Sequence, residues 1–396
     1  MRQQLCFASF LLLVLVSVCA SADQFTPVIA STLTQDARPI PGTDGRWHIV
    51  YELVITNTRP TLATLKKIAV VDGSLASNVL ASYEGTELVS RLRTMGGAAV
   101  KDATIPYSES RLFLINFSLD ESAKVPPRLL HQFSLTGAPT PSHTPTTPKL
   151  LSYSAAPIDI SRKLPVIGPP LAGKHWVAVN GCCEPNGAHR TTGLPVNGQI
   201  YFAQRFAIDW MQMDDAGRLV HGDPSDVHNY TSYGADVLAV ADGTVVDMLN
   251  KLDDQIPGKL PDPKTITIEN VDGNHVVIDL GDGVYAFYAH MQKGSVGVQR
   301  GARVKRGDVL GKLGNTGNTS APHLHFHLME GSSVLGSNGI PYAIDAFEFA
   351  GQVSKTDFDK ATGVEGDWSK GLLSSPSPRK DQFPLDLNIV NFAAKK

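Results

Sequence analysis

Cysteine is scarce in this chain of 396 residues, which has only four. Cys6 and Cys19 fall in an apolar N-terminal segment, so Cys182 and Cys183 are the only two beyond it. Adjacent cysteines cannot connect distant segments, which excludes a disulfide framework as the source of stability. A vicinal disulfide and a pair of buried free thiols are both compatible with Cys182-Cys183.

An excess of charge of either sign is also missing. The chain has 35 Lys and Arg against 38 Asp and Glu, a formal net charge of −3 at pH 7. This balance argues against a nucleic-acid partner and gives no indication of binding to a membrane surface.

Long apolar runs are absent except at the start of the chain. Arg2 is followed by an apolar run from Leu5 to Val18 and then by Ala20-Ser21-Ala22. The order is typical of a secretory signal peptide, and the run is short for a membrane span, which needs about 20 residues. We expect residues 1–22 to be a signal peptide and the mature chain, without a transmembrane anchor, to be exported to the periplasm or the extracellular space.

Helical periodicity is scarce, and short apolar, β-branched runs separated by turn signals replace it. Between residues 23 and 136 we expect strands at Trp47–Thr56, Leu65–Val71, Arg111–Leu119 and Leu129–Leu135. This spacing predicts an immunoglobulin-like sandwich, to which we assign an accessory role.

The rest of the chain divides by composition. Gly137–Pro148 has four prolines among small polar residues, and prolines continue to Gly173, so we expect residues 137–173 to be a linker. Residues 174–350 again read as strands, among them 199–210 and 265–270. We expect the polar stretch 351–396 to be a peripheral tail that wraps the preceding domain through Phe383–Phe392.

A histidine-rich segment stands out near the end of this second β region. His323, His325 and His327 alternate with Leu324 and Phe326. Because side chains alternate across a strand, the three imidazoles should share one face and the apolar residues should face a core. Neutral imidazole is a common ligand of zinc, so the segment predicts a metal site.

The surroundings of this segment resemble the LytM/lysostaphin-like zinc metallopeptidases, which cleave peptides of bacterial cell walls. The matching pieces, within about 196–349, are Tyr288-Ala289-His290, Gly307-Asp308-Val309-Leu310-Gly311, Asn315-Thr316-Gly317 and Pro322-His323-Leu324-His325-Phe326. The resemblance implies an antiparallel β catalytic domain over 174–350, Zn²⁺ as cofactor and peptidoglycan peptides as substrate.

The resemblance also assigns roles to single residues. His325 matches one zinc ligand, and Asp209, which closes Arg205-Phe206-Ala207-Ile208-Asp209, matches another. The first position of that motif should be His but is Arg205, whose guanidinium offers no lone pair. His290 and His323 match the two histidines that act on water and oxyanion without binding the metal. His327 stands where the family often has Glu, as a partner of a ligand or as the next outward residue.

Three solutions remain open for the third ligand. Asn197-Gly198 predicts a hairpin turn that would set His189 across from residues 204–206 on the neighbouring strand, in reach of the vacated place. His221 and His228 lie in a polar loop and are weaker candidates. The third solution is that the metal site is lost.

The sequence therefore predicts an all-β protein in which a Pro-rich linker joins the sandwich to the catalytic domain. The preferred function is a zinc metalloendopeptidase with His189, Asp209 and His325 as ligands and His290 and His323 as catalytic residues. The alternative is a metal-free LytM-like module that binds the wall or regulates another hydrolase. A lipoyl-type carrier, suggested by Asp242-Gly243 and Gly307-Asp308, leaves the histidines unexplained.

Overall fold

The computed structural model describes residues 23–360 and 367–394, so the predicted signal peptide lies outside the described residues. Regular structure is almost entirely β, as predicted, with two short α-helices, α1 (Gly85–Arg91) and α2 (Lys355–Lys360). Over the described ranges, neither helix has the length and hydrophobicity to traverse a bilayer.

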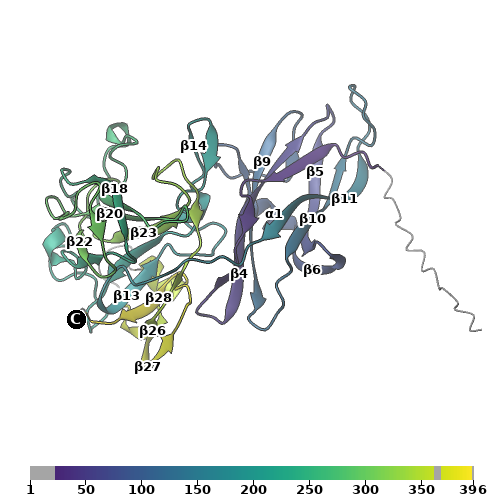
Figure 1. The fold of residues 1–396 in the computed structure, drawn as a ribbon. Coiled ribbons are helices and arrows are strands. Elements are labelled where there is room, and N and C mark those ends of the chain that lie inside the picture. Colours follow the sequence, from purple (N-terminus) through teal and green to yellow (C-terminus); the bar gives the residue numbers. More distant parts are fainter. Residues whose placement is uncertain (1–22, 361–366, 395–396) are drawn as a thin grey trace, which may run out of the picture.

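Residues 28–160, here called the N-terminal sandwich, form two sheets that face each other (Figure 1). The first sheet has the order β1-β4-β9-β7, with β3 beside β4, and the second has the order β2-β11-β10-β5-β6, with β8 beside β5. Their bounds are β1 Val28–Thr32, β2 Asp36–Ala37, β3 Ile40–Pro41, β4 Arg46–Asn57, β5 Ala63–Asp72, β6 Leu75–Glu84, β7 Leu92–Thr94, β8 Thr104–Ile105, β9 Ser110–Asp120, β10 Arg128–Gly137 and β11 Lys149–Ile160. We propose that this is the immunoglobulin-like sandwich expected from the sequence, because immunoglobulin-like sandwiches have this strand order in their two sheets.

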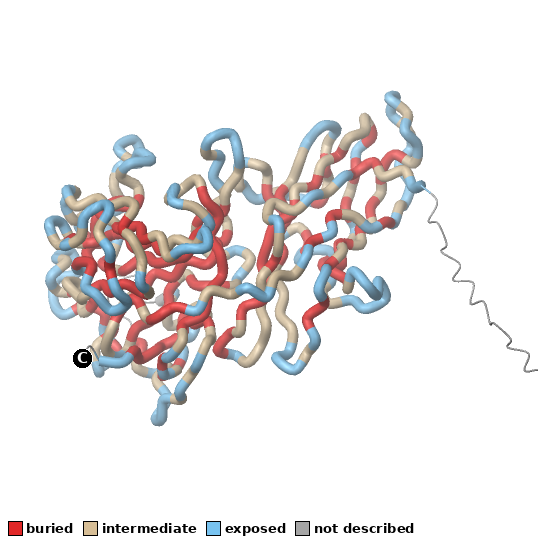
Figure 2. The backbone as a smooth tube through the Cα atoms, viewed as in Figure 1, coloured by how far each residue is buried: buried red, intermediate tan, exposed pale blue. Residues whose placement is uncertain are grey.

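The core of the sandwich comes from alternating residues of both sheets. Tyr51 and Leu53 of β4 and Phe113 of β9 meet Ile68 of β5 and Phe133 of β10, all nearly or fully buried. In Figure 2, buried residues (red) recur along the strands of the sandwich. The four strands predicted here are present as β4, β5, β9 and β10.

The linker predicted over residues 137–173 is shorter in the structure. Lys149–Ile160 form β11, which pairs with β10 along nearly its whole length, so this part of the stretch belongs to the sandwich. The prolines of 139–148 lie in the connection between β10 and β11. The prolines suggested a linker, but proline is compatible with a strand near the edge of a sheet. β11 contains Pro157, and besides β10 it pairs with β2 over two residues.

Residues 166–392, here called the C-terminal half, are built on one large antiparallel sheet (Figure 1). Its order is β21-β18-β19-β20-β23-β16-β13-β28-β26-β27, with β24 beside β23. The bounds are β13 Gly173–Val179, β16 Ile208–Gln212, β18 Gly243–Leu249, β19 Asn274–Asp279, β20 Tyr285–Met291, β21 Arg303–Val304, β23 Leu324–Met329, β24 Gly339–Ile340, β26 Phe347–Gln352, β27 Leu372–Arg379 and β28 Asn388–Phe392. Short pairs outside it are β12 Val166–Ile167 with β25 Ala343–Ile344, β14 Leu194–Val196 with β15 Gln199–Tyr201, and β17 Asp236–Leu238 with β22 Val309–Lys312.

Two expectations for this half were wrong. The segment after residue 350 is not peripheral, because β28 lies between β13 and β26 in the main sheet and all five of its residues are buried. The strand expected over 199–210 is interrupted by a turn at 203–206, and 265–270 forms no strand. The turn at 203–206 contains no glycine and is held by backbone hydrogen bonds, such as Ala207 N–H to the Gln204 carbonyl, so it gave no compositional signal.

The first sheet of the sandwich is covered on both faces. Tyr51 and Leu53 of β4 face the sandwich core, whereas Val50 packs into the core of the C-terminal half. Leu112 and Leu114 of β9 pack on Phe202 of the C-terminal half. In Figure 1, β4 lies on the side of the sandwich that faces the other half. The two halves therefore share an apolar contact, although each has its own core.

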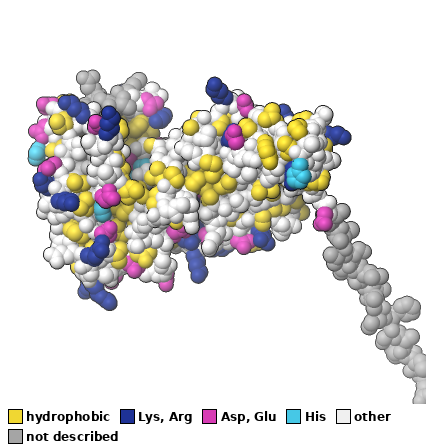
Figure 3. All heavy atoms as spheres, turned by 90° about the horizontal axis from the view of Figure 1, so that it is seen from above, with side chains coloured by type: hydrophobic (Ala, Val, Ile, Leu, Met, Phe, Trp, Pro, Cys, Tyr) yellow, Lys and Arg dark blue, Asp and Glu magenta, His cyan; other side chains and the backbone are white. Residues whose placement is uncertain are grey.

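The molecular surface carries charges of both signs. On the face shown in Figure 3, basic and acidic side chains are interspersed over both halves. This distribution agrees with the small formal net charge of −3.

A buried histidine in the sandwich makes stability depend on pH. His131 of β10 donates from Nδ1 to the Ala156 carbonyl (2.6 Å) and accepts at Nε2 from the Tyr51 hydroxyl (2.7 Å). Burial lowers the pKa of His131 from 6.5 to about 4. As pH falls through 6.5 the unfolded chain takes up a proton that the folded chain does not, so stability is lost between pH 6.5 and 4, by about 3 kcal/mol in total.

We therefore expect the urea-unfolding free energy of the wild type to fall more steeply between pH 7 and 5 than that of His131→Gln. His143→Gln, at an exposed position, should keep the wild-type slope. Equal slopes for all three proteins would contradict the assignment.

Candidate metal centre

Three neighbouring strands of the C-terminal sheet place the central residues of the site. In the antiparallel pair of β16 and β23, Asp209 lies directly opposite His325, and Ala289 of β20 lies opposite His325 on the other side. Asp209 Oδ1 is 2.9 Å from His325 Nδ1. Leu324, Phe326 and Leu328 face the core of this half, as the alternating pattern predicted.

His189 reaches the same place from outside the sheet. It begins a single turn of 3-10 helix, η1 (His189–Thr191), and its Nε2 lies 3.3 Å from Asp209 Oδ2. The predicted hairpin exists as β14 and β15, with Val196 opposite Gln199. The predicted route was wrong, however, because His189 is not a cross-strand neighbour of residues 204–206; its Nδ1 instead bonds to the Ala207 carbonyl at 3.1 Å.

His290 and His323 complete the cluster. His323 Nε2 is 3.4 Å from Asp209 Oδ1, and the rings of His290 and His323 are 4.7 Å apart. His290, at the end of β20, has a φ of 60°, a backbone conformation that non-glycine residues rarely adopt and that is often found at functional sites. This conformation breaks the alternation of β20.

Hydrogen bonds orient each histidine ring and determine which of its nitrogens faces the cluster. The Nδ1–H groups of His290 and His323 donate to the Thr316 and Ala321 carbonyls, both at 2.7 Å. His189 likewise donates to Ala207, so Nε2 is the nitrogen that faces the cluster in all three rings. His325 is reversed: its Nδ1 contacts Asp209 Oδ1 at 2.9 Å and its Nε2 contacts His327 Nδ1 at 3.0 Å. Nδ1 is therefore the nitrogen that it would offer to a metal, with Nε2–H then donating to His327. Hydrogen-bond partners on the second ring nitrogen orient metal-binding imidazoles in this way.

Burial and charge act against each other in the cluster. Burial raises the pKa of the Asp209 carboxyl, but the charges of His189 and His323 outweigh burial and hold it well below its usual range. Burial lowers the pKa of His189 and of His323, but Asp209 outweighs burial and raises both. Burial, followed by His323 and His325, holds the pKa of His290 well below its usual range. Asp209 is thus an anion among imidazoles.

The geometry fits a metal ion. His189, Asp209 and His325 are buried, and each offers one ligand atom within 4.8 Å of the others. Two imidazoles and a carboxylate with free lone pairs are the donor set of catalytic zinc sites, which use three protein ligands. The predicted ligands and the predicted catalytic histidines are therefore brought together, and their roles stay proposals.

The other candidates lie elsewhere. The side chain of His221 is 46% exposed and pairs with Asp214, and that of His228 is 72% exposed and pairs with Asp226. Arg205 does not point at the metal position, because residues 203–206 form a turn and the guanidinium pairs with Glu52.

Sequence reasoning missed one residue of the site. Asn180, with a φ of 56°, donates from Nδ2 to Asp209 Oδ2 at 2.8 Å. It follows the apolar run of β13, and the Asn180-Gly181 pair is a turn signal that could have indicated a chain reversal there. The adjacent Cys182 and Cys183 form a vicinal disulfide, one of the two states that the sequence left open.

The pairing of His325 with His327 leads to a prediction. Replacing His327 by Leu leaves the buried His325 Nε2–H without an acceptor, so zinc affinity should fall about 10- to 100-fold. His327→Gln, whose amide oxygen can accept, should lose less. Chelator competition on the folded proteins measures both, and wild-type affinity in His327→Leu would contradict this role.

Comparison with known proteins identifies part of this half. The family described as Peptidase family M23 matches residues 227–336. That range contains His290, His323 and His325 and begins after His189 and Asp209, in agreement with the departure of the first metal motif from the pattern.

Two characterised proteins match short segments. Peptidoglycan DD-endopeptidase ShyA of Vibrio cholerae is 42% identical over 57 residues, 14% of this chain and 13% of that protein. Glycyl-glycine endopeptidase ALE-1 of Staphylococcus capitis is 44% identical over 61 residues, 15% of this chain and 16% of that protein. The matched segments thus span less than a fifth of either relative.

Among solved structures, the catalytic domain of the prophage-encoded M23 protein EnpA from Enterococcus faecalis aligns with 45% of this chain and 93% of its own, at 19% identity and a TM-score of 0.24. The family match and both segment matches agree with the histidine pattern, and the chain contains a peptidase family M23 domain.

Proposed function

We propose that this protein is an exported zinc metalloendopeptidase that hydrolyses peptide bonds of bacterial cell-wall peptidoglycan. The observation that carries the proposal is the convergence of His189, Asp209 and His325 within 4.8 Å, beside His290 and His323. The family match supports a peptidase, and the names of both relatives support a cell-wall substrate.

The replaced motif position does not argue against a metal site. Arg205 turns away from the cluster and pairs with Glu52, so its charge does not oppose a cation there. His189 offers the lone pair that Arg205 lacks. A metal-free binding module would have no need for five convergent imidazole and carboxylate groups in one buried cluster.

The residues suit peptide hydrolysis. Zinc held by His189, Asp209 and His325 would supply Lewis acidity, which acidifies water and polarises a carbonyl group. His290 and His323 both have Nδ1–H tied to a backbone carbonyl, so each can accept or hold a proton at Nε2 alone. One Nε2 can take the proton of the attacking water while the other donates to the oxygen on which negative charge develops.

The ligand role of His189 can be tested by metal analysis. His189→Ala removes one of three ligands, so the purified protein should lose most of its zinc. Its affinity for added zinc should fall at least about 100-fold, which is more than the loss of a residue that only hydrogen-bonds to a ligand usually causes. His221→Ala is the matched control and should keep wild-type zinc. Equal zinc in both variants would remove His189 from the site, and a wild type that binds no zinc after reconstitution would leave the binding-module alternative.

His323 should separate catalysis from metal binding. His323→Ala should retain zinc but cleave isolated peptidoglycan about 10²- to 10⁴-fold more slowly, because a proton-transfer group is lost. His228→Ala, at an exposed position, should cleave at the wild-type rate. Release of soluble peptides, followed by chromatography, measures the rate. Near-normal cleavage by His323→Ala, or zinc loss in step with activity, contradicts the assigned role.

A further inference from the structure

One carboxylate of the N-terminal sandwich is buried against the other half. Glu52 lies on β4 between Tyr51 and Leu53, which face the sandwich core, and therefore points the opposite way, toward the C-terminal half. Its exposed fraction is 0%. A carboxylate in such a place must be paired, because burying a lone charge is very costly.

Two arginines of the C-terminal half provide the pairing. Arg205 binds Glu52 through two parallel contacts, Nε to Oε1 at 2.8 Å and Nη2 to Oε2 at 2.6 Å. Arg190 donates from Nη1 to Glu52 Oε1 and from Nη2 to the Tyr51 carbonyl at 2.8 Å. Both arginines are 4% exposed. Paired guanidinium–carboxylate contacts of this kind fix orientation as well as adding energy.

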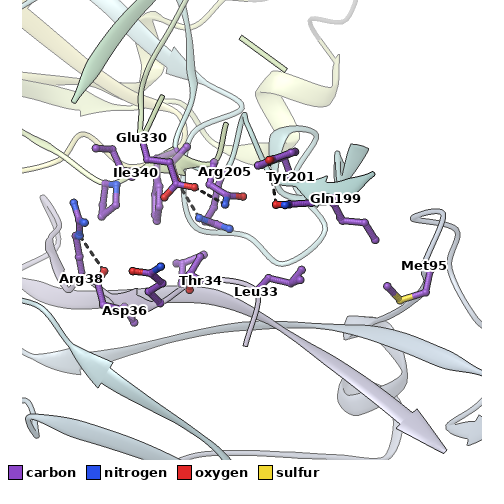
Figure 4. A pocket seen from close by; sticks show the side chains of 18 residues that line it. Leu33, Thr34, Asp36, Arg38, Met95, Gln199, Tyr201, Arg205, Glu330 and Ile340 are labelled. Atoms are coloured by element: carbon purple, nitrogen blue, oxygen red, sulfur yellow. Dashed lines mark hydrogen bonds and ion pairs between the residues drawn. The ribbon is translucent and has the colours of Figure 1, made fainter. Parts of the chain in front are cut away.

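Two further contacts of the arginines go to backbone oxygens, one from each half. Arg190 Nη2 also reaches the Ile115 carbonyl of β9 at 3.2 Å, and Arg205 Nη1 reaches the Gly339 carbonyl at 3.0 Å. Figure 4 shows Arg205 at the cleft between the halves, facing the segment that contains Leu33 and Thr34. The cluster is thus specific to the docked arrangement of the two halves.

Both arginines are close in the sequence to groups that hold His189, the proposed ligand. Arg190 is the next residue in η1, and the His189 ring bonds to the carbonyl of Ala207, two residues after Arg205. Glu52 therefore holds the two segments that fix the ring of His189: the segment that carries it and the segment that orients it.

We infer that Glu52 of the N-terminal sandwich is the positioning residue for the metal ligand His189, so that the metal site is complete only when the two halves are docked. This inference rests on the proposed metal site. It assigns the sandwich a role in metal binding, in addition to the accessory role expected from sequence.

The first test compares zinc affinity in full-length variants. Glu52→Gln removes the charge at nearly constant shape, and zinc affinity by chelator competition should fall about 10- to 100-fold, as for other residues that orient a ligand. Glu84→Gln, a sandwich carboxylate whose side chain is 57% exposed, is the matched control and should bind zinc as the wild type does.

The second test distinguishes positioning from general destabilisation. If Glu52 acts through His189, Glu52→Gln should weaken zinc binding in the wild type but not further in a His189→Ala background, because the effect has no ligand to act on. Equal weakening in both backgrounds, or wild-type affinity in folded Glu52→Gln, overturns the inference.

Arg190→Lys is a milder substitution that serves as the test if Glu52→Gln does not fold. If thermal melting shows that Glu52→Gln does not fold, Arg190→Lys keeps the charge but cannot reach Glu52 and the two carbonyls together, and it should weaken zinc binding about 10-fold. Unchanged affinity in folded Arg190→Lys then overturns the inference. A wild type that binds no zinc instead overturns the proposed function, whereas a zinc-binding wild type with unaffected variants overturns only the role of Glu52.

Discussion

The structure depends on the satisfaction of buried carboxylates. Asp209 lies within the sheet of the C-terminal half, where an unpaired anion would be very unfavourable. Its two oxygens are contacted by His189, His323, His325 and Asn180, which come from a 3-10 turn, a loop, a neighbouring strand and the end of β13. Each of these contacts also places a nitrogen lone pair or a proton at the cluster, so the requirement that stabilises the anion also assembles the site. Glu52 repeats the principle at the boundary between the halves.

The predictable part of the site was the part with local order. His325 and His327 alternate along β23 and His323 directly precedes it, so the alternating pattern placed these three histidines. Asp209 was assigned from the resemblance of residues 205–209 to a metal motif, and it lies on β16, the strand paired with β23. Prediction failed where the chain leaves regular structure. Arg205 lies in a turn, so the side-chain alternation of a strand, which would have pointed it at the metal, does not apply. His189 lies in a single turn of 3-10 helix, which is too short to produce a periodic sequence pattern.

The same distinction holds for the fold. Strands such as β4, β5, β9 and β10 have long alternating patterns and were predicted, whereas β11 was hidden by neighbouring prolines and β28 by a polar context. Long-range partners such as Glu52 and Arg205 are 153 residues apart. Nothing in the local sequence of either residue indicates the other, because their contact is created by the docking of two separately formed sheets.

The position of β28 has a consequence for how the C-terminal half is synthesised. Val390 of β28 pairs with Trp176 of β13, a separation of 214 residues (390 − 176). Until residues 388–392 have been synthesised, one edge of β13 has no partner, although its apolar side chains Trp176 and Val177 are fully buried in the finished sheet. An open edge with apolar side chains is a template for association with other chains. The sheet of the C-terminal half therefore closes late, and until then the nascent half presents an edge that is prone to association with other chains.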